Sequence, residues 1–286
     1  MNSIVLKIKR VIGWFVRKNR RRISDYIYKD YDDNPLDVDL TTFSRQAFLD
    51  RAEYAKSQIA GRFIDDIKRE FGYLIDSEFI HDLALTTQIT IKVSKPLYSH
   101  GYLLYGAVRK YLECNKYIDN LIVLETGTAR GFSALVMAKA LDDANRQGEI
   151  ITLDKLPSDK AIYWNCIHDH DGRKTRLQLL DKWRKLIDDH ILFVQGYSDV
   201  VLRQLTLPRI NVAFLDGGHD YRTVKYELHY VKSRQLKGDI IICDDYTQDQ
   251  YPGLVAAANE FLADSGYLSK IFKGSSKRMY LYCKKN

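Results

Sequence analysis

Short β-type runs alternate with helical stretches over the second half of the chain. The β-type runs, rich in apolar and β-branched residues, occur at 121–125, 150–153, 191–195, 211–215 and 239–243. Between them, apolar residues recur at helical spacing over 132–141, 177–187 and 224–231. This alternation is typical of βαβ units that build a parallel sheet. The pattern therefore predicts an α/β fold with five parallel strands.

The C-terminal end departs from this alternation. After a helical stretch at 254–263, two more β-type runs follow at 268–272 and 279–283. Only GSSK (Gly274 to Lys277) and a neighbour or two separate them, which is too short for a crossover helix. Two strands joined so closely must be antiparallel, so we expect a final hairpin.

Residues 40–118 show helical spacing with interruptions and few turn signals. We interpret them as a helical N-terminal cap that leads directly into an α/β domain over 119–286. Residues 1–39 form a basic amphipathic segment and linker. Drawn as a helix, this segment gathers apolar side chains on one face, namely Ile4, Ile8, Val11, Ile12 and Phe15. Three interpretations stay open: an anchor on an anionic membrane surface, a helix docked on its own core or on a sister subunit, and a partly ordered tail.

The net charge of +7 belongs to the two ends of the chain. Of the 44 Lys and Arg residues, eight lie in 1–22 and six in 265–286, and neither segment contains an acid. The remaining 30 face all 37 acidic residues, so the middle carries a net charge of −7. A nucleic-acid-binding protein usually carries its positive surface on the folded domain, which argues against a nucleic-acid substrate.

Two further observations concern the location of the protein. No apolar run approaches the length of roughly 18 residues that a membrane span needs. The 4 Cys are scattered without CxxC spacing, which is typical of free thiols in a reducing compartment. We therefore expect a cytoplasmic protein, with residues 1–22 as its candidate contact with the inner face of a membrane.

A glycine-bearing turn follows the first β-type run, in LIVLETGTARGFSALVMAKAL. Gly127 and Gly131 allow a ligand to approach the backbone closely, and the helix beginning near Phe132 offers free N–H groups. Asp154 ends the second run, where a carboxylate can bind both hydroxyls of a ribose. Strand, turn, helix, strand and terminal acid in this order predict a site for an adenosine-containing ligand.

The turn differs from a dinucleotide fingerprint. It reads GTARG, with Ala129 in place of the middle glycine, and Glu125 precedes it at the end of the strand. A carboxylate at that position would repel a pyrophosphate but favour a ligand with an ammonium or sulfonium group.

At these residues the sequence resembles the class I S-adenosylmethionine-dependent methyltransferases. ETGTARG resembles their first motif and ITLD their second, and FLDGGHDYRTVKYEL with GDIIICDDY resembles the branch of small-molecule O-methyltransferases that includes macrocin O-methyltransferase. The resemblance covers roughly 95–285 and implies a Rossmann-like, doubly wound, seven-stranded sheet whose last strand is antiparallel. It assigns S-adenosylmethionine to Glu125, Thr126, Gly127, Thr128, Gly131, Ser133, Asp154 and Asp216. Many members of this branch are dimers or larger, so a homo-oligomer is a further expectation.

Three carboxylates are expected to meet beyond the strand ends. Asp216 ends the fourth β-type run, and Asp244 and Asp245 end the fifth. In the sheet order that the resemblance implies, these strands are neighbours. Crowded carboxylates repel one another unless they are protonated or bridged by a cation, and hard oxygen ligands favour Mg²⁺, with Ca²⁺ or Mn²⁺ as alternatives. We therefore predict a metal site at Asp216, Asp244 and Asp245.

His219 is the candidate catalytic base. It lies three residues after Asp216, and methyl transfer to a hydroxyl needs a proton acceptor with a pKa near neutrality. Part of the branch has an acid where this chain has Gly218, which shifts the assignment to His219, with Asp220 behind it. The alternative is a histidine that only packs against the loop.

These observations predict an O-methyltransferase that acts on a sugar-like or other small polar acceptor with the help of Mg²⁺. An NAD-dependent oxidoreductase is disfavoured by GTARG and by the final hairpin. A methyltransferase of nucleic acid or protein is disfavoured by the charge of the middle segment. A non-catalytic S-adenosylmethionine-binding module stays open because of Ala129 and Gly218.

Overall fold

A computed structural model describes residue 36 and residues 43–59, 61–92, 95–263, 266–274 and 277–286. The predictions for the basic segment at 1–22 fall outside these residues. Within the part of the chain that the structure describes, no helix has both the length and the apolar character needed to cross a bilayer.

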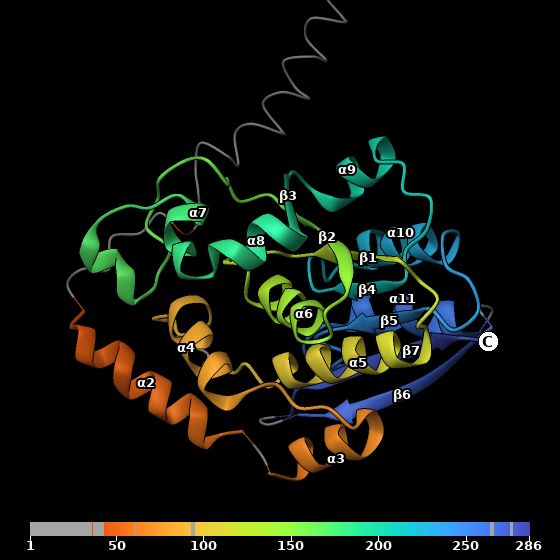
Figure 1. The fold of residues 1–286 in the computed structure, drawn as a ribbon, viewed down its shortest axis with the longest axis horizontal. Helices are drawn as coiled ribbons and strands as arrows, with labels where there is room; N and C mark the ends of the chain where they lie inside the picture. Colours follow the sequence, from red (N-terminus) through yellow and green to blue (C-terminus); the bar gives the residue numbers. More distant parts are fainter. Residues whose placement is uncertain (1–35, 37–42, 60, 93–94, 264–265, 275–276) are drawn as a thin grey trace, which may run out of the picture.

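The described residues form one mixed sheet of seven strands (Figure 1). In spatial order the strands are β3 (Ile191–Gln195), β2 (Gln147–Asp154), β1 (Asn120–Thr126), β4 (Val212–Leu215), β5 (Ile240–Cys243), β7 (Met279–Lys285) and β6 (Tyr267–Lys273). β1 to β5 pair in parallel, and the order reverses at β1, from which β2 and β4 extend on opposite sides. In such doubly wound sheets, ligands bind outside the carboxyl ends of the strands at the reversal. The predicted Rossmann-like architecture is confirmed.

β7 runs antiparallel to both of its neighbours, β5 and β6. Cys243, at the end of β5, pairs with Leu281 near the start of β7. This confirms the predicted hairpin and antiparallel last strand. The geometry also brings the residues just before β7 to the carboxyl end of β5, which is the functional edge of the sheet.

Alternating side chains of each strand enter two separate cores, as the two-residue period of a strand requires. On β4, Val212 and Phe214 face one core, whereas Ala213 and Leu215 face the other. Helices α5 (His100–Cys114), α6 (Phe132–Asp143) and α8 (Arg184–His190) cover the first face. Helices α9 (Ser198–Gln204), α10 (Tyr221–Lys232) and α11 (Pro252–Ala263) cover the second.

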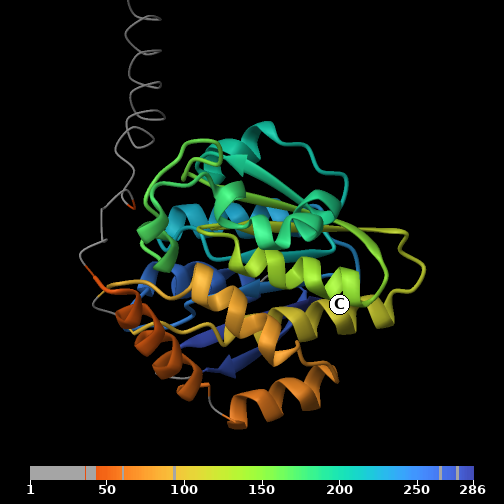
Figure 2. The same cartoon turned by 60° about the vertical axis from the view of Figure 1, so that its left-hand side comes forward.

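Three helices, α2 (Arg45–Ser57), α3 (Gly61–Phe71) and α4 (Ser77–Thr87), lie outside α5 and α6 (Figure 2). α3 packs against α5, α4 against α6, and α2 against α4. The side chains of Ser44 and Asp76 accept hydrogen bonds from the first turns of α2 and α4, respectively. Phe48, Ile67 and Leu83 are fully buried in the same core as the sheet. The helices expected at 40–118 are therefore present, and they share one core with the α/β domain.

The helix expected at 177–187 is divided into shorter pieces. The structure has α7 (Arg176–Leu179), a 3₁₀ turn at Asp181–Trp183 and then α8. Leu180, between α7 and the turn, has non-helical dihedral angles, and its carbonyl accepts a hydrogen bond from the Trp183 N–H at 2.9 Å. Because a 3₁₀ turn also returns to the same face after three residues, hydrophobic spacing could not distinguish the two conformations.

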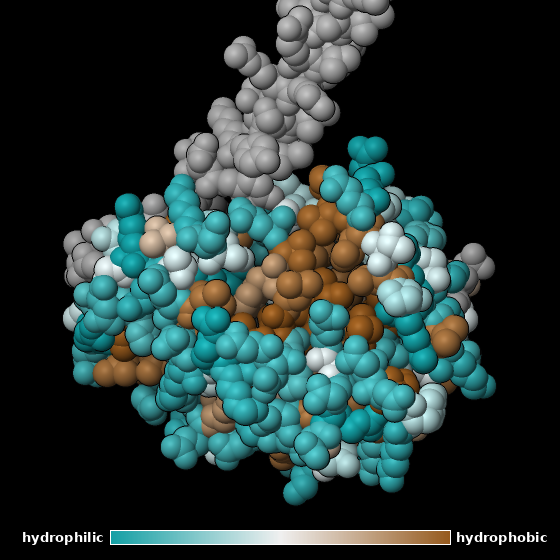
Figure 3. Space-filling view, turned by 45° about the horizontal axis from the view of Figure 1, so that its top comes forward, coloured by the Kyte–Doolittle hydropathy of each residue, from teal (hydrophilic) through white to brown (hydrophobic). Residues whose placement is uncertain are grey.

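β3 is the edge strand at one end of the sheet. Its Leu192 is 48% exposed, and Val194 is only partly buried. Figure 3 shows a broad apolar area on the face that comes into view when the top of Figure 1 is brought forward, where β3 and α9 lie. This edge is less well covered than the strands at the centre of the sheet.

Candidate active site

A cavity of about 510 Å³ opens at the carboxyl edge of the sheet beside β1, β2 and β4. Gly127, Asp154 and Asp216, which follow or end these strands, line it. Its volume lies within the range of about 300–1,000 Å³ that is usual for small-molecule sites. The cavity is therefore large enough for a nucleoside-sized ligand at the position expected for this fold.

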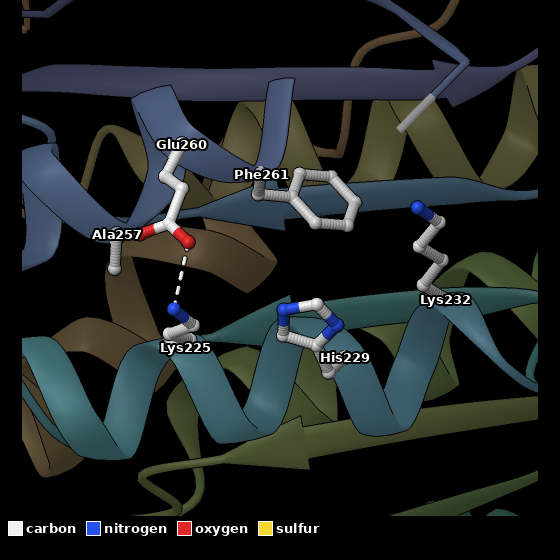
Figure 4. Close-up of a pocket in the computed structure, with 6 residues that line it drawn as sticks. All are labelled: Lys225, His229, Lys232, Ala257, Glu260 and Phe261. Carbon is white, nitrogen blue, oxygen red and sulfur yellow. Dashed lines mark hydrogen bonds and ion pairs between the residues drawn. The ribbon is translucent and has the colours of Figure 1, made fainter. Parts of the chain in front are cut away.

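A second hollow, between α10 and α11, has a volume of only about 80 Å³ (Figure 4). Lys225 and Glu260 form an ion pair of 2.7 Å across it. It is too small for a nucleoside. The cavity at the sheet edge is the candidate site because it lies at the carboxyl ends of the strands where the sheet order reverses.

Gly127 allows two backbone segments to touch at the floor of the cavity. Its φ is +91°, and a Cβ at this position would lie 2.2 Å from the carbonyl oxygen of Asp216. The Asp216 N–H donates to the carbonyl of Thr126 at 3.0 Å, which joins the ends of β1 and β4. A residue with a side chain would both adopt an unfavourable φ and collide with the β4 end.

Asp154 lines the cavity in a fixed orientation. Its Oδ2 accepts the N–H of Ala129 at 2.6 Å, and its Oδ1 accepts the N–H of Leu156 at 2.7 Å. Each carboxylate oxygen has a further lone pair, so both can still accept from a ligand. Ala129 has a φ of +46°, a conformation that L residues seldom adopt. Its N–H bond to Asp154 helps to hold the turn in this shape.

Glu125 lies beneath the cavity and does not line it, contrary to its expected position at the mouth. It is fully buried, and its two oxygens accept hydrogen bonds from the hydroxyls of Ser133 and Thr152. Burial raises the pKa of Glu125 to about 7, although both hydroxyl contacts favour the charged form. The carboxyl group is buried against Ser133 of α6 and Thr152 of β2. Its role is therefore to support the turn from below.

The other residues assigned to the cofactor divide between the cavity and the core. Gly127, Asp154 and Asp216 line the cavity. Thr126, Thr128 and Ser133 are buried and lie outside the lining, as does Gly131, which is the N-cap of α6 with a φ of +94°. These four shape the turn behind the cavity wall.

The sequence reasoning missed part of the cavity wall. Leu156 comes from the loop after β2, Tyr197 comes from the loop after β3, Ser198 is the first residue of α9, and Leu36 comes from the N-terminal side. For the loop residues, a signal was available, because they directly follow strands whose carboxyl ends form the site edge. For Leu36 no local pattern pointed to the cavity.

Asp216, His219 and Asp245 form a compact group at one end of the cavity. One potential ligand atom from each lies within 4.8 Å of the others. His219 stacks on the ring of Tyr251 with a centroid distance of 4.2 Å, and its Nε2 is 3.2 Å from Asp245 Oδ2. That Nε2 is buried, and its approach to Asp245 is too poorly aligned for a hydrogen bond. The imidazole is thus held beside the carboxylates with its nitrogen incompletely satisfied.

Asp244 is not part of this group, although the metal prediction included it. Arg278, the residue just before β7, binds both of its oxygens, with Nε 2.9 Å from Oδ1 and Nη2 on Oδ2. Nε is also 3.4 Å from Asp245 Oδ1. The antiparallel β7 therefore supplies a cation that the local sequence around Asp244 could not reveal. Asp244 pairs with this guanidinium, and His219 takes its place in the donor group.

The two half-buried carboxylates of the group differ in their electrostatics. Burial and the charge of Asp244 raise the pKa of Asp216 well above its ordinary value. Burial also opposes ionisation of Asp245, but contact with His219 and the charge of Arg278 outweigh it and lower the pKa of Asp245. The site thus combines Asp245, which ionises readily, with Asp216, which needs a neighbouring cation in order to ionise.

Residues 124–246 match the family model of a methyltransferase domain. The chain is similar in structure to the O-methyltransferase NovP, with 15% identity and a TM-score of 0.53 over 73% of this chain and 99% of that one. It is also similar to the O-methyltransferase TomG from Streptomyces achromogenes in complex with SAM (15% identity, TM-score 0.49, 74% and 92% covered). A further similar structure is an O-methyltransferase from Bacillus cereus in complex with SAH, with 15% identity and a TM-score of 0.47 over 79% of this chain and 92% of that one. No curated protein sequence matches the chain.

Proposed function

We propose that the chain is an S-adenosylmethionine-dependent methyltransferase that methylates a hydroxyl of a sugar-like or other small polar acceptor, because residues 124–246 match the model of a methyltransferase domain and the sheet has the strand order of the class I fold. One observation carries this proposal. Asp154 and the group of Asp216, His219 and Asp245 lie at the same sheet edge, and a single cavity is lined by both Asp154 and Asp216.

The cavity suits the cofactor through this chain's own residues. Asp154, with both oxygens oriented by backbone N–H groups, would accept hydrogen bonds from the two ribose hydroxyls. The apolar side chains of Leu156 and Tyr197 would contact the adenine. The Gly127 turn lets the rest of the donor approach the end of β4.

The donor group also suits a divalent cation. Two carboxylates and a buried imidazole nitrogen without an aligned partner converge within 4.8 Å. We assign Asp216 and Asp245 as the residues that would hold Mg²⁺, because carboxylate oxygens are its preferred ligands. A bound cation would lower the pKa of the acceptor hydroxyl.

His219 would then accept the hydroxyl proton. As it does so, the acceptor oxygen forms a bond to the methyl carbon and the bond from that carbon to sulfur breaks, which leaves S-adenosylhomocysteine. Asp245 stabilises the resulting imidazolium at 3.2 Å. Tyr251 keeps the ring in place by stacking. Positioning of this kind supplies much of the rate in reactions that need little covalent help from the protein.

Calorimetric titrations with S-adenosylhomocysteine and with NAD, each with and without EDTA, test the proposal. We expect the first ligand to bind and NAD not to bind, and we expect Asp154→Asn to weaken binding. Turnover is then measured as S-adenosylhomocysteine release with a panel of sugars and other small hydroxyl compounds. Binding of NAD alone would refute the proposal, and binding without turnover across the panel would favour the non-catalytic module.

For residues 1–22 we propose contact with an anionic membrane surface, based on eight basic residues and one apolar face. Co-sedimentation with vesicles of phosphatidylserine and phosphatidylcholine would compare the full chain with a chain lacking these residues. Equal sedimentation of the two proteins would rule out the contact.

A further inference from the structure

Arg176 is buried behind the wall of the cavity. It is the first residue of α7, is only 1% exposed and lies outside the lining. Thr175 and Gln178 form a capping box, in which each side chain bonds the other's backbone N–H, and this fixes the start of the helix. The central guanidinium carbon lies over the rings of Trp164 and Phe193, at 5.5 and 5.2 Å from their centroids. The side chain is therefore held in one place.

The guanidinium directs its donors at two backbone carbonyls and one hydroxyl. Nε donates to the carbonyl of Ala129 at 3.1 Å, and Nη2 donates to that of Leu156 at 3.3 Å. Nη1 donates to the hydroxyl of Ser158 at 2.5 Å. Ala129 lies in the turn after β1 and Leu156 in the loop after β2, and both line the cavity. Arg176 thus joins two parts of the cavity wall that follow different strands.

The same two wall residues hold Asp154. Its Oδ2 accepts the N–H of Ala129 at 2.6 Å, and its Oδ1 accepts the N–H of Leu156 at 2.7 Å. The carboxylate therefore takes the N–H groups of these two residues, and the guanidinium of Arg176 takes their carbonyls. The result is a closed hydrogen-bonded ring, in which the position of the Asp154 carboxylate depends on that of Arg176.

The ring also contains a strained residue. Ala129 has a φ of +46°, and such a conformation persists only where the surrounding structure holds it. The N–H of Ala129 is held by Asp154 and its carbonyl by Arg176. Without the guanidinium, only the bond to the carboxylate would hold this turn against its strain.

The charge of Arg176 acts on the ring from behind the wall. Among the described residues, Arg176 forms no ion pair. Burial lowers the pKa of Arg176, and the charges of Asp154 and Glu125 act in the opposite direction. The charge of Asp154 is thus opposed by a guanidinium that does not bind its oxygens.

We propose that Arg176 is a positioning residue for the cofactor: through Ala129 and Leu156 it orients the Asp154 carboxylate toward the ribose hydroxyls. The inference rests on the proposed function, in which Asp154 binds the ribose. A planar guanidinium can bond two carbonyls and a hydroxyl at fixed angles, whereas the ammonium group of lysine has no such fork. Arginine is therefore required at this position for its shape as well as for its charge.

The test measures binding by calorimetry on the full chain. The probes are S-adenosylhomocysteine and its dideoxy analogue, which lacks both ribose hydroxyls. Arg176→Met should weaken binding of S-adenosylhomocysteine by about tenfold or more. The Kd of the analogue should be unchanged, because the analogue has no hydroxyls for Asp154 to bind. A general distortion of the wall would instead weaken binding of both probes.

A double-mutant cycle shows whether Arg176 acts through Asp154. The cycle compares wild type, Arg176→Met, Asp154→Asn and the double variant. The double variant should bind S-adenosylhomocysteine no more weakly than Asp154→Asn alone, since the carboxylate that Arg176 orients is already absent.

Arg176→Lys separates the charge from the fork. It keeps a cation behind the wall but cannot bond both carbonyls in one plane, so we expect an affinity between those of wild type and Arg176→Met. If Arg176→Met does not fold, the same cycle is carried out with Arg176→Lys, for which a loss of about threefold or more is expected.

Arg234→Met is the matched control. Arg234 also donates to a carbonyl, that of Tyr230 at 3.0 Å, and to a hydroxyl, that of Ser233 at 2.8 Å. It also lies over an aromatic ring, that of Tyr230 at 3.6 Å, but it follows α10 and is not part of the cavity lining. This variant should bind both probes like wild type.

Three results would overturn the positioning role: unchanged binding of S-adenosylhomocysteine by the Arg176 variants, equal weakening of both probes, or additive losses in the double variant. A wild type that does not bind S-adenosylhomocysteine would instead refute the proposed function. The two failures are thus distinguishable.

Discussion

Arg278 and Asp244 form a two-point ion pair that joins the start of β7 to the end of β5. Asp244 is fully buried, and the guanidinium is its direct charge partner. The pair fixes the backbone from which Asp245 reaches the active site. It also explains why Asp244 and Asp245, although adjacent, have different roles.

Replacement of Arg278 by Met should therefore destabilise the fold strongly. Removal of one partner of a buried ion pair typically costs about 3–5 kcal/mol, because it leaves a buried charge uncompensated. Urea unfolding of wild type and variant measures the difference. Lys270→Met is the control, since Lys270 pairs with Glu70 at the surface and such pairs contribute about 0–1 kcal/mol. Similar losses of unfolding free energy in both variants would show that the Arg278–Asp244 pair contributes no more to stability than a surface ion pair.

Glu125 should make stability depend on pH. Its folded-state pKa of about 7 exceeds the ordinary value of 4.5, so the folded state binds the proton more tightly. The stabilisation is fully present below about pH 4.5 and is lost as the pH rises through 7. Glu125→Gln removes this dependence. We expect the variant to gain about 2–3 kcal/mol relative to wild type between pH 5 and pH 8, at about 1.4 kcal/mol per pKa unit.

Urea unfolding at several pH values tests this difference. Glu227, which is buried on α10 and also has a pKa of about 7, contributes to the pH dependence of both proteins. Its effect therefore cancels in the comparison. Parallel stability curves for wild type and Glu125→Gln would contradict the prediction.

Gly127→Ala should disrupt the turn. The new Cβ would meet the Asp216 carbonyl at 2.2 Å in addition to the strain of a positive φ. We expect a loss of a few kcal/mol in stability and no measurable binding of S-adenosylhomocysteine. Gly72→Ala is a matched control, because Gly72 has a φ of +81° and no atom within 4 Å of its would-be Cβ. It should lose only about 1 kcal/mol, and equal losses would show that the collision is unimportant.

Asp245→Asn should weaken binding of a divalent cation. Mn²⁺ bound to the full chain can be counted by electron paramagnetic resonance, with EDTA as the check on reversibility. We expect an affinity at least about tenfold lower in the variant, since a charged ligand becomes neutral. Asp249→Asn, at an exposed position of the same loop, should bind like wild type. Equal affinity of all three proteins would remove the metal from the proposed mechanism.

His219→Ala should reduce turnover without loss of cofactor binding. A general base typically contributes about 10²–10⁴-fold to the rate, so kcat should fall by that amount while the Kd of S-adenosylhomocysteine is unchanged. His229→Ala is the control, because His229 is exposed on α10, away from the cavity. Full activity of His219→Ala would exclude the residue as the base.

Much of the fold could be predicted because local pattern and tertiary structure agree there. The strand at 191–195 coincides with β3, and the short connection before 279 forced the antiparallel hairpin. Asp154 and Asp216 could also be located, because a residue that ends a parallel strand must lie at the carboxyl edge. The break at Leu180 could not be predicted, since α-helical and 3₁₀ turns both place apolar residues three positions apart on the same buried face.

The sequence by itself determined which residues end the strands, and hence which carboxylates reach the functional edge. Only the tertiary structure decided what each of them faces. Glu125 is buried against Ser133 of α6 and Thr152 of β2, whereas Asp154 lines the open cavity. Asp244 meets a guanidinium that lies 34 residues away along the chain. The reason is physical: alternation and capping are local, but the charge and solvent around a side chain depend on segments that only folding brings together.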